Sequence, residues 1–257
     1  MAGYADWLGL DDQALATRAG ATAKAVAIGI AGIAAIFAWA IFVALLVGIF
    51  LPGGLGTTAR TVLSTLASGA GTLSVVALYL RYSDRDVSFL DLHVPDLRGF
   101  GYAIVGTLAI LGGNLAIGLA FQQVGIKTAQ HTIVRTAETD PIILLALVPL
   151  SYLVIAPGEE LLFRNVVQKS LRETFSPVAG VVIASAIFAA VHLPAYSSPG
   201  QSLVATLDTL VIIFVLALVL GTVYERTGNV VVSMLVHGTF NAIAFALTYA
   251  QFVGRLG

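Results

Sequence analysis

The sequence AVAIGIAGIAAIFAWAIFVALLVGIFL, residues 25–51, contains no charged side chain. A helix of about 20 apolar residues crosses the hydrocarbon core of a bilayer, which is about 30 Å thick. This stretch therefore predicts a transmembrane helix. It is too long, and the residues before it are too polar, for a cleaved signal peptide, so we expect it to remain as an anchor.

Further stretches of the same character follow along the chain, and together they set the fold class. The other predicted spans are residues 61–80, 100–122, 141–170, 177–193, 203–224 and 229–250. The span 141–170 carries charges in its second half, and it is interpreted either as one long helix or as two pieces broken at Pro157-Gly158. We therefore predict an all-α fold, a polytopic membrane helix bundle of seven or eight transmembrane helices.

The composition of the whole chain agrees with this interpretation. Of the 257 residues, 58% are apolar and 11% are charged, against about 45–50% and about 25% in soluble domains. The mean hydropathy is +0.94. A net charge of −1 argues against a nucleic-acid partner, and the lack of cysteine excludes disulfides, thiolate metal sites and a cysteine nucleophile. These values indicate an integral membrane protein.

The chain divides into a short polar start and one membrane domain. Residues 1–24 form an N-terminal cytoplasmic or membrane-surface segment, in which Trp7, Leu8, Leu10 and Leu15 among acids suggest a surface helix, with a disordered tail as the alternative. Residues 25–257 read as a single membrane domain without linker or repeat. With seven spans, nine Lys and Arg fall on the N-terminal side and four on the other. Because cytoplasmic loops retain Lys and Arg, we expect a cytoplasmic N-terminus.

Ionisable side chains inside spans are costly, so they are candidates for function. The first group is Glu159-Glu160-Leu161-Leu162-Phe163-Arg164. Glu160 and Arg164 lie four residues apart with the acid first, which is the favourable order for an ion pair within a helix. Glu159 is rotated about 100° from Glu160. We therefore predict that Glu159 is the free carboxylate, on the same face as Phe163.

Two more groups lie on later helices. They are Phe188-Ala189-Ala190-Val191-His192 and His237-Gly238-Thr239-Phe240-Asn241. Phe188 and His192 share one helix face, and so do His237 and Asn241. If a turn follows Lys169, Glu159 and His192 both lie about 25 Å from it and can meet across an antiparallel hairpin. The first three spans hold no acid, base or histidine, which favours one shared polar site in the C-terminal half.

Pro157 immediately precedes the two acids, and two interpretations of it stay open. If a new helix begins there, Glu159 and Glu160 lie in an electropositive first turn that stabilises their ionised forms. In the other interpretation, Pro157 only kinks a continuous span, and a neighbouring helix fills the gap.

The three groups resemble the signature of the CPBP family, the CaaX proteases and bacteriocin-processing enzymes, also called Abi-type intramembrane endopeptidases. The family motifs EExxxR, FxxxH and HxxxN correspond here to Glu159-Glu160 with Arg164, Phe188 with His192, and His237 with Asn241. The resemblance covers about residues 140–250, which form the expected catalytic core. Asn165 departs from it, because family members often have glycine there, and this puts close helix packing at that position in doubt.

The resemblance implies a protease that hydrolyses peptide bonds of a membrane-associated peptide or prenylated protein. Glu159 would act as general base on a water that His192 helps to hold. His237 and Asn241 would supply oxyanion contacts. Arg164 would hold Glu160 and shape the site. Phe163 and Phe188 would bind substrate. No cofactor is expected in this mechanism.

Other functions fit parts of the same pattern. Glu159, His192 and His237 are possible zinc ligands, although the spacing is not HExxH and the sequence shows no second-shell carboxylate for either histidine. Glu and His side chains in spans also form proton relays, so a proton-coupled transporter is a further alternative. A noncatalytic membrane scaffold would keep the fold, but it would not need every motif residue. The sequence does not distinguish a prenyl pocket from a peptide groove.

Overall fold

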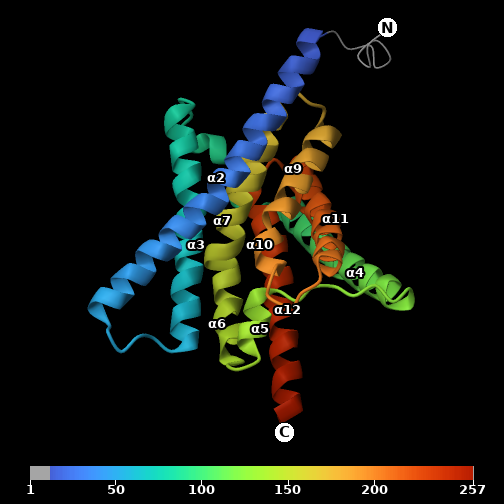
Figure 1. The fold of residues 1–257 in the computed structure, drawn as a ribbon. Coiled ribbons are helices and arrows are strands. Elements are labelled where there is room, and N and C mark those ends of the chain that lie inside the picture. The colour runs from blue at the N-terminus through green and yellow to red at the C-terminus, as the bar shows by residue number, and fades with distance from the viewer. Residues whose placement is uncertain (1–11, 257) are drawn as a thin grey trace.

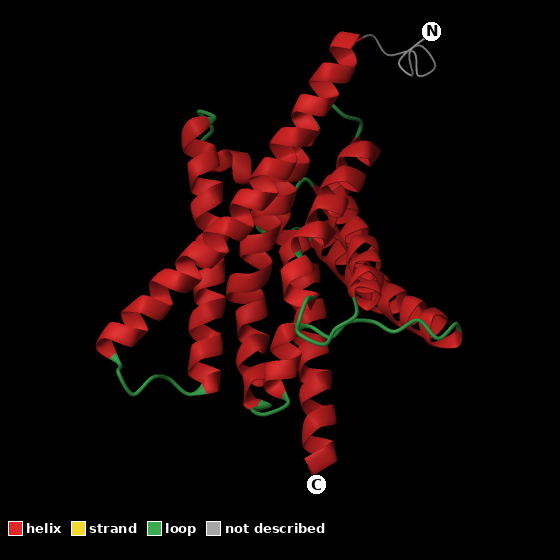
Figure 2. Cartoon of the chain, in the orientation of Figure 1, coloured by secondary structure: helices red, strands yellow, loops and turns green. Residues whose placement is uncertain are grey.

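The computed structural model describes residues 12–256, and within them every regular element is helical (Figure 1, Figure 2). The first long helices are α2 (Asp12–Phe50), α3 (Thr57–Tyr82) and α4 (Leu97–Gln123), with the short η1 (Val87–Leu90) before α4. The short helix α5 (Thr132–Ala137) follows α4. The C-terminal half contains α9 (Pro177–Val191), α10 (Leu193–Tyr196), α11 (Leu203–Thr227) and α12 (Val230–Leu256). The predicted all-α polytopic bundle is confirmed.

Six of the seven predicted spans are helices long and apolar enough to cross a membrane. The exception is the predicted span 177–193, which forms α9 and is only 15 residues long. Pro194 explains the early end, because a proline has no backbone N–H to donate and its ring clashes with the carbonyl group four residues before it. His192 consequently caps the C-terminus of α9 instead of lying inside a helix.

The first span differs from the prediction at its start. The helix α2 begins at Asp12, so residues 12–24 belong to the same helix as the predicted span 25–51. These residues are rich in alanine, which has the highest helix propensity. Of the predicted surface helix, Trp7, Leu8 and Leu10 lie outside the described residues, and Leu15 lies in α2.

The fourth span is one continuous helical run, Ile142–Leu171, with two wide π-helical sections. Its parts are α6 (Ile142–Leu150), the π-helix η2 (Ser151–Ile155), α7 (Ala156–Glu160), the π-helix η3 (Leu161–Gln168) and α8 (Lys169–Leu171). The π turn directly before Pro157 gives the proline ring room, since the ring would clash with a carbonyl in a regular α-helix. No new helix begins at Pro157, so the electropositive first turn considered for the two acids does not form.

The apolar core lies where this run packs between the early and late helices. Its largest cluster joins side chains of α2, α3, η3, α9, α11 and the start of α12. Close approach of α2 and α3 depends on Gly71, where a Cβ atom would lie 2.7 Å from the backbone nitrogen of Ile36. The run that bears Glu159 and Glu160 is thus enclosed by other helices in the middle of the bundle (Figure 1).

Candidate active site

Glu160 and Arg164 form the most buried ion pair of the described residues. The Nε atom of Arg164 lies 3.2 Å from Oε2 of Glu160, and both side chains are 0% exposed. The predicted pairing at four-residue spacing therefore occurs. Buried charges need a partner with good geometry, and Glu160 has a second one, because Nδ1–H of His237 donates to its Oε1 at 2.9 Å.

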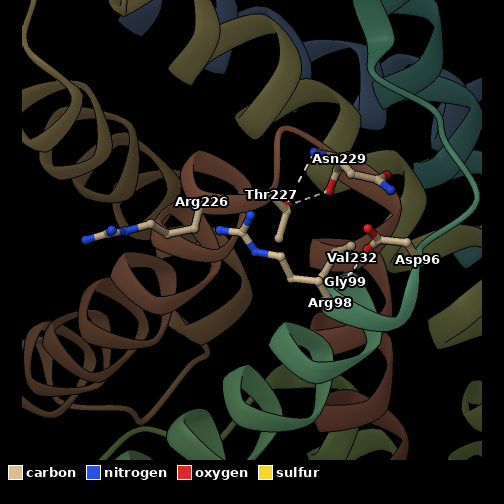
Figure 3. Close-up of a pocket in the computed structure, with 7 residues that line it drawn as sticks. All are labelled: Asp96, Arg98, Gly99, Arg226, Thr227, Asn229 and Val232. Carbon is tan, nitrogen blue, oxygen red and sulfur yellow. Dashed lines mark hydrogen bonds between the residues drawn. The ribbon is translucent and has the colours of Figure 1, made fainter.

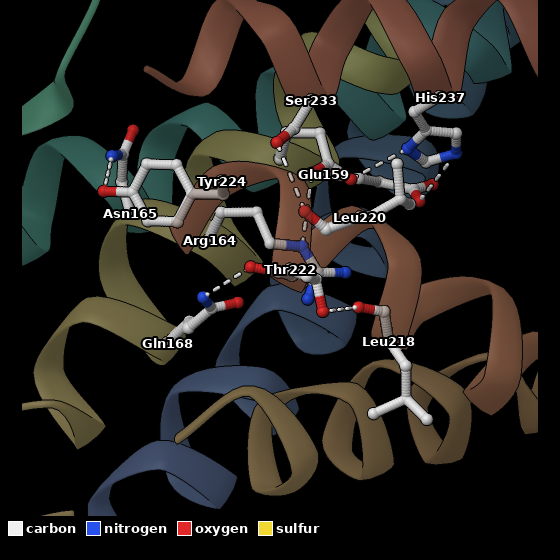
Figure 4. Close-up of polar contacts among 12 residues, drawn as sticks. Glu159, Arg164, Asn165, Gln168, Leu218, Leu220, Thr222, Tyr224, Ser233 and His237 are labelled. Carbon is white, nitrogen blue, oxygen red and sulfur yellow. Dashed lines mark hydrogen bonds and ion pairs between the residues drawn. The ribbon is translucent and has the colours of Figure 1, made fainter. Parts of the chain in front are cut away.

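Glu159 lies on the other side of the helix and remains partly accessible. Its side chain is 24% exposed, and Oε2 lies 3.8 Å from Nε2 of His192 and 3.9 Å from Nε2 of His237. Figure 4 shows Glu159 beside the ring of His237. The structure thus brings one acid from the fourth span together with imidazoles from α9 and α12.

The hydrogen bonds of the two rings define which nitrogen faces Glu159. Nδ1–H of His192 donates to the carbonyl oxygen of Phe188 at 2.7 Å. Nδ1–H of His237 donates to Glu160. Both Nε2 atoms therefore point toward the same carboxylate. The expected lack of a second-shell carboxylate is therefore wrong for His237, which bonds to Glu160, whereas His192 bonds to a backbone carbonyl.

Phe188 and Phe163 support the imidazoles from behind. The Phe188 ring centroid lies 4.5 Å from that of His192, 6.1 Å from that of His237 and 5.0 Å from that of Phe163. The Arg164 guanidinium lies over the Phe188 ring at 5.1 Å, a stabilising cation–π contact. Both phenylalanines are only 4% exposed. We therefore revise their predicted role from substrate binding to support of the site.

Asn241 lies one helical turn beyond His237 on α12. It is partly buried, and within residues 12–256 its side chain makes no hydrogen bond. Its amide N–H groups are therefore available as donors on the helix that carries His237.

Two residues near the site escaped the sequence prediction. His131 caps the N-terminus of α5, and its ring lies 5.0 Å from that of Tyr196. Burial and the nearby His192 lower the pKa of His131 to about 4. Burial, together with the Glu159 carboxylate, raises the pKa of Tyr196 to about 12. No spacing rule connects a loop histidine to a site 60 residues further along the chain, so only the fold reveals this neighbourhood.

Glu159, His192 and His237 are also the predicted ligands of the alternative zinc site. Two imidazole nitrogens and a carboxylate are suitable ligand types, and both rings have the supporting acceptors that zinc ligands require. However, ligand atoms about 2 Å from one zinc ion lie about 3.3 Å from each other, and the observed separations are 3.8 and 3.9 Å. Within residues 12–256, no three His, Asp or Glu side chains are close enough to form a ready metal site.

Two hollows occur away from these residues. A polar pocket of about 110 Å³ lies between the start of α4 and the α11–α12 turn (Figure 3). It is lined by Asp96, Arg98, Gly99, Arg226, Thr227, Asn229 and Val232. An apolar groove of about 410 Å³ lies between the C-terminal half of α2 and the start of α3. Neither lining includes a predicted site residue.

The fold and this cluster together define a class of protein, a polytopic helical membrane protein with one carboxylate and two imidazoles at a shared site. Residues 141–243 match the family model of the Rce1-like proteins, described as type II CAAX prenyl endopeptidase Rce1-like. The match confirms the resemblance to the CaaX proteases over this part of the chain, and it includes Glu159, His192, His237 and Asn241. Comparisons with curated proteins and with solved structures gave no match. The chain is accordingly an integral membrane protein whose residues 141–243 are similar to the CAAX-type endopeptidases.

Proposed function

We propose that this protein hydrolyses a peptide bond with a water molecule activated by Glu159. The observation that carries the proposal is the position of the Glu159 carboxylate, 3.8 and 3.9 Å from the Nε2 atoms of His192 and His237. These separations are too long for direct hydrogen bonds. In the proposed arrangement, one water bridges the groups and donates one hydrogen to the carboxylate and the other to an Nε2 lone pair.

The reaction then needs only groups already in place. Glu159 takes a proton from the water as its oxygen attacks the substrate carbonyl carbon. When the C–N bond breaks, the proton passes from Glu159 to the leaving amine, so the products are a carboxylic acid and an amine, which exchange a proton to give a carboxylate and an ammonium group. Glu159 is then a carboxylate again, and no covalent bond forms between the enzyme and the substrate.

Asn241 and His237 are the proposed donors to the oxyanion. The Asn241 amide makes no other hydrogen bond within residues 12–256, and it shares a helix face with His237. Because Nδ1–H of His237 is committed to Glu160, this ring donates from Nε2 only as imidazolium. Glu160 and Arg164 are the proposed positioning pair. The buried Glu160 carboxylate bonds to both Arg164 and His237, so it holds the His237 ring at a fixed angle.

The family match supports a prenylated protein or another membrane-associated peptide as the substrate class. The protein reconstituted in liposomes would be incubated with a farnesylated peptide ending in a CaaX sequence and with the same peptide without the lipid. Mass spectrometry of the products should show release of the last three residues from the prenylated peptide. Equal cleavage of both peptides would contradict a prenyl substrate, and cleavage of neither would contradict the proposed activity on this class.

Metal dependence is measured in the same assay. The water mechanism predicts that dialysis against a chelator leaves the cleavage rate unchanged and that the purified protein holds no stoichiometric zinc. Stoichiometric zinc, with loss of cleavage after its removal and recovery after its return, would replace Glu159 as general base by a metal site of Glu159, His192 and His237.

A further inference from the structure

A polar cluster outside the predicted site joins the N-terminal half of the chain to the helices that carry Glu160 and His237. Its members are Asp91, Asn165, Lys169 and Tyr224, called here the Asp91 clamp. The carboxylate atom Oδ2 of Asp91 accepts from the Tyr224 hydroxyl at 2.5 Å and from Nζ of Lys169 at 2.7 Å. Asn165 donates to the Tyr224 hydroxyl at 2.8 Å and to Asp91 at 3.5 Å.

The clamp fixes the helix that bears both acids. Asn165 directly follows Arg164, the partner of Glu160, and it is 0% exposed. Figure 4 shows the amide of Asn165 at the hydroxyl end of Tyr224. Lys169 also donates to the carbonyl oxygen of Phe89 at 2.8 Å. The position where the family often has glycine therefore holds a side chain with a specific polar partner.

The loop that contains Asp91 and His93 also fixes the start of α12. The backbone N–H of Val230, the first residue of this helix, donates to the carbonyl oxygen of Asp91 at 3.2 Å. The side chain of Asn229 donates to the carbonyl oxygen of His93 at 3.0 Å. Since helix N-termini leave N–H groups without partners, these bonds set where α12 begins. His237 follows two turns later, about 10 Å along the helix.

Asp91 itself has a left-handed backbone, with φ of 48°. This conformation is unfavourable for residues other than glycine, although Asp and Asn tolerate it. A residue held there indicates that the surrounding contacts require it. Asp84, in the same loop, has φ of 50°, but its exposed side chain makes no hydrogen bond within residues 12–256. The two positions thus share the strained backbone and differ in the contacts of the side chain.

We propose that Asp91 is a positioning residue for the contact between Glu160 and His237. It acts through other residues, because it holds the acid-bearing helix and the start of α12 at a fixed spacing and does not itself touch the substrate. The proposal lies outside the family-matched residues 141–243. It deepens the proposed protease function and rests on it only for the kinetic part of the test.

The test uses the full-length protein in detergent with ¹⁵N-labelled histidine. In the wild type, the His237 Nδ1–H that bonds to Glu160 should give a downfield proton signal, identified by its loss in His237→Gln. Asp91→Ala should lose this signal and Asp84→Ala should keep it. This measurement does not require any cleavage, so it tests the clamp even if no peptide is cleaved.

Kinetics provide the second readout. Asp91→Ala should lower kcat about tenfold with KM unchanged, because the groups that act in the transition state are displaced. Asp91→Asn keeps the tolerated backbone and an acceptor oxygen, so it should restore kcat to within about threefold of the wild type. Asp84→Ala should match the wild type in both parameters.

The outcomes separate the two proposals. If the wild type cleaves and Asp91→Ala keeps both the His237 signal and kcat, the clamp proposal is wrong and the protease proposal stands. If Asp91→Ala does not fold, Tyr224→Phe replaces it, because it removes the hydroxyl that donates to Asp91. A weakened His237 signal in Tyr224→Phe would support the clamp, and an unchanged signal would overturn it.

Discussion

Glu159 and Glu160 are adjacent in the chain, yet the fold gives them different chemical environments. Glu160 is fully buried between Arg164 and His237, whereas Glu159 is 24% exposed and meets both histidines only across gaps. A helix turns about 100° per residue, so neighbouring residues can face a packed interior and an open site. This difference supports the proposed division between a positioning acid and a general base.

The difference predicts opposite effects on stability. Glu160→Gln leaves the Arg164 charge buried without a counter-charge, which should cost about 3–5 kcal/mol. Glu159→Gln removes a partly exposed group and should cost less than about 1 kcal/mol. Thermal unfolding of both variants in one detergent would measure this. Equal losses of stability would show that the burial of the Glu160–Arg164 pair does not matter for folding.

His131 predicts a pH dependence of stability. Its pKa is about 4 in the folded protein and 6.5 as the reference value, so the unfolded chain takes up the proton at a higher pH. The neutral His131 ring therefore makes its full contribution to the free energy of unfolding above pH 6.5. This contribution, up to about 3 kcal/mol, is lost as the pH falls toward 4.

His131→Asn retains a residue that can cap α5 but removes the titrating ring. The difference in unfolding free energy between wild type and His131→Asn should thus change between pH 7.5 and pH 4.5, with the wild type losing more. Parallel curves for the two proteins would show that His131 titrates normally.

At the scale of elements, two features bring α12 to the acid-bearing run. The π turn of η2 places Tyr152 and Ser151 against α12, and Gly238 allows the close approach. A Cβ atom at Gly238 would lie 2.8 Å from Cδ1 of Tyr152 and 3.3 Å from the carbonyl oxygen of Ser151. Since Gly238 directly follows His237, the packing of these two helices sets the depth of that ring.

Gly238→Ala should therefore affect both folding and cleavage. Overpacking is expected to cost about 1–3 kcal/mol, and the shift of His237 should lower kcat about tenfold. The matched control is Gly113→Ala in α4, where a Cβ atom meets nothing within 4 Å and helix propensity predicts a gain of about 0.5–1 kcal/mol. Unfolding and cleavage of the two variants would be compared. A fully active Gly238→Ala variant would contradict the role of this contact.

At the scale of the whole molecule, α2, α3 and α4 pack against a C-terminal half that carries the proposed site. The distribution of Lys and Arg predicts a cytoplasmic N-terminus. Because the chain has no cysteine, Asp84→Cys and Lys127→Cys each introduce a single labelling site. In intact cells, a membrane-impermeant maleimide should label Lys127→Cys and not Asp84→Cys. The reverse pattern would invert the predicted orientation.

Hydropathy and helical spacing were sufficient to predict the all-α bundle, the Glu160–Arg164 pair and the residues that meet around Glu159. These features depend on local periodicity and on charges within apolar runs. The sequence could not predict the π turns beside Pro157 or the early end of α9, because both depend on competition between local backbone preferences. It also missed His131 and Asp91, whose partners are distant in the chain and follow no repeating spacing.

The most direct test of the central claim is single-turnover cleavage of the prenylated peptide by wild type and Glu159→Gln, both checked for equal thermal unfolding. If Glu159 is the base that activates water between His192 and His237, the amide variant should bind the peptide and release no product. Product formation by Glu159→Gln at a rate close to that of the wild type would contradict the account.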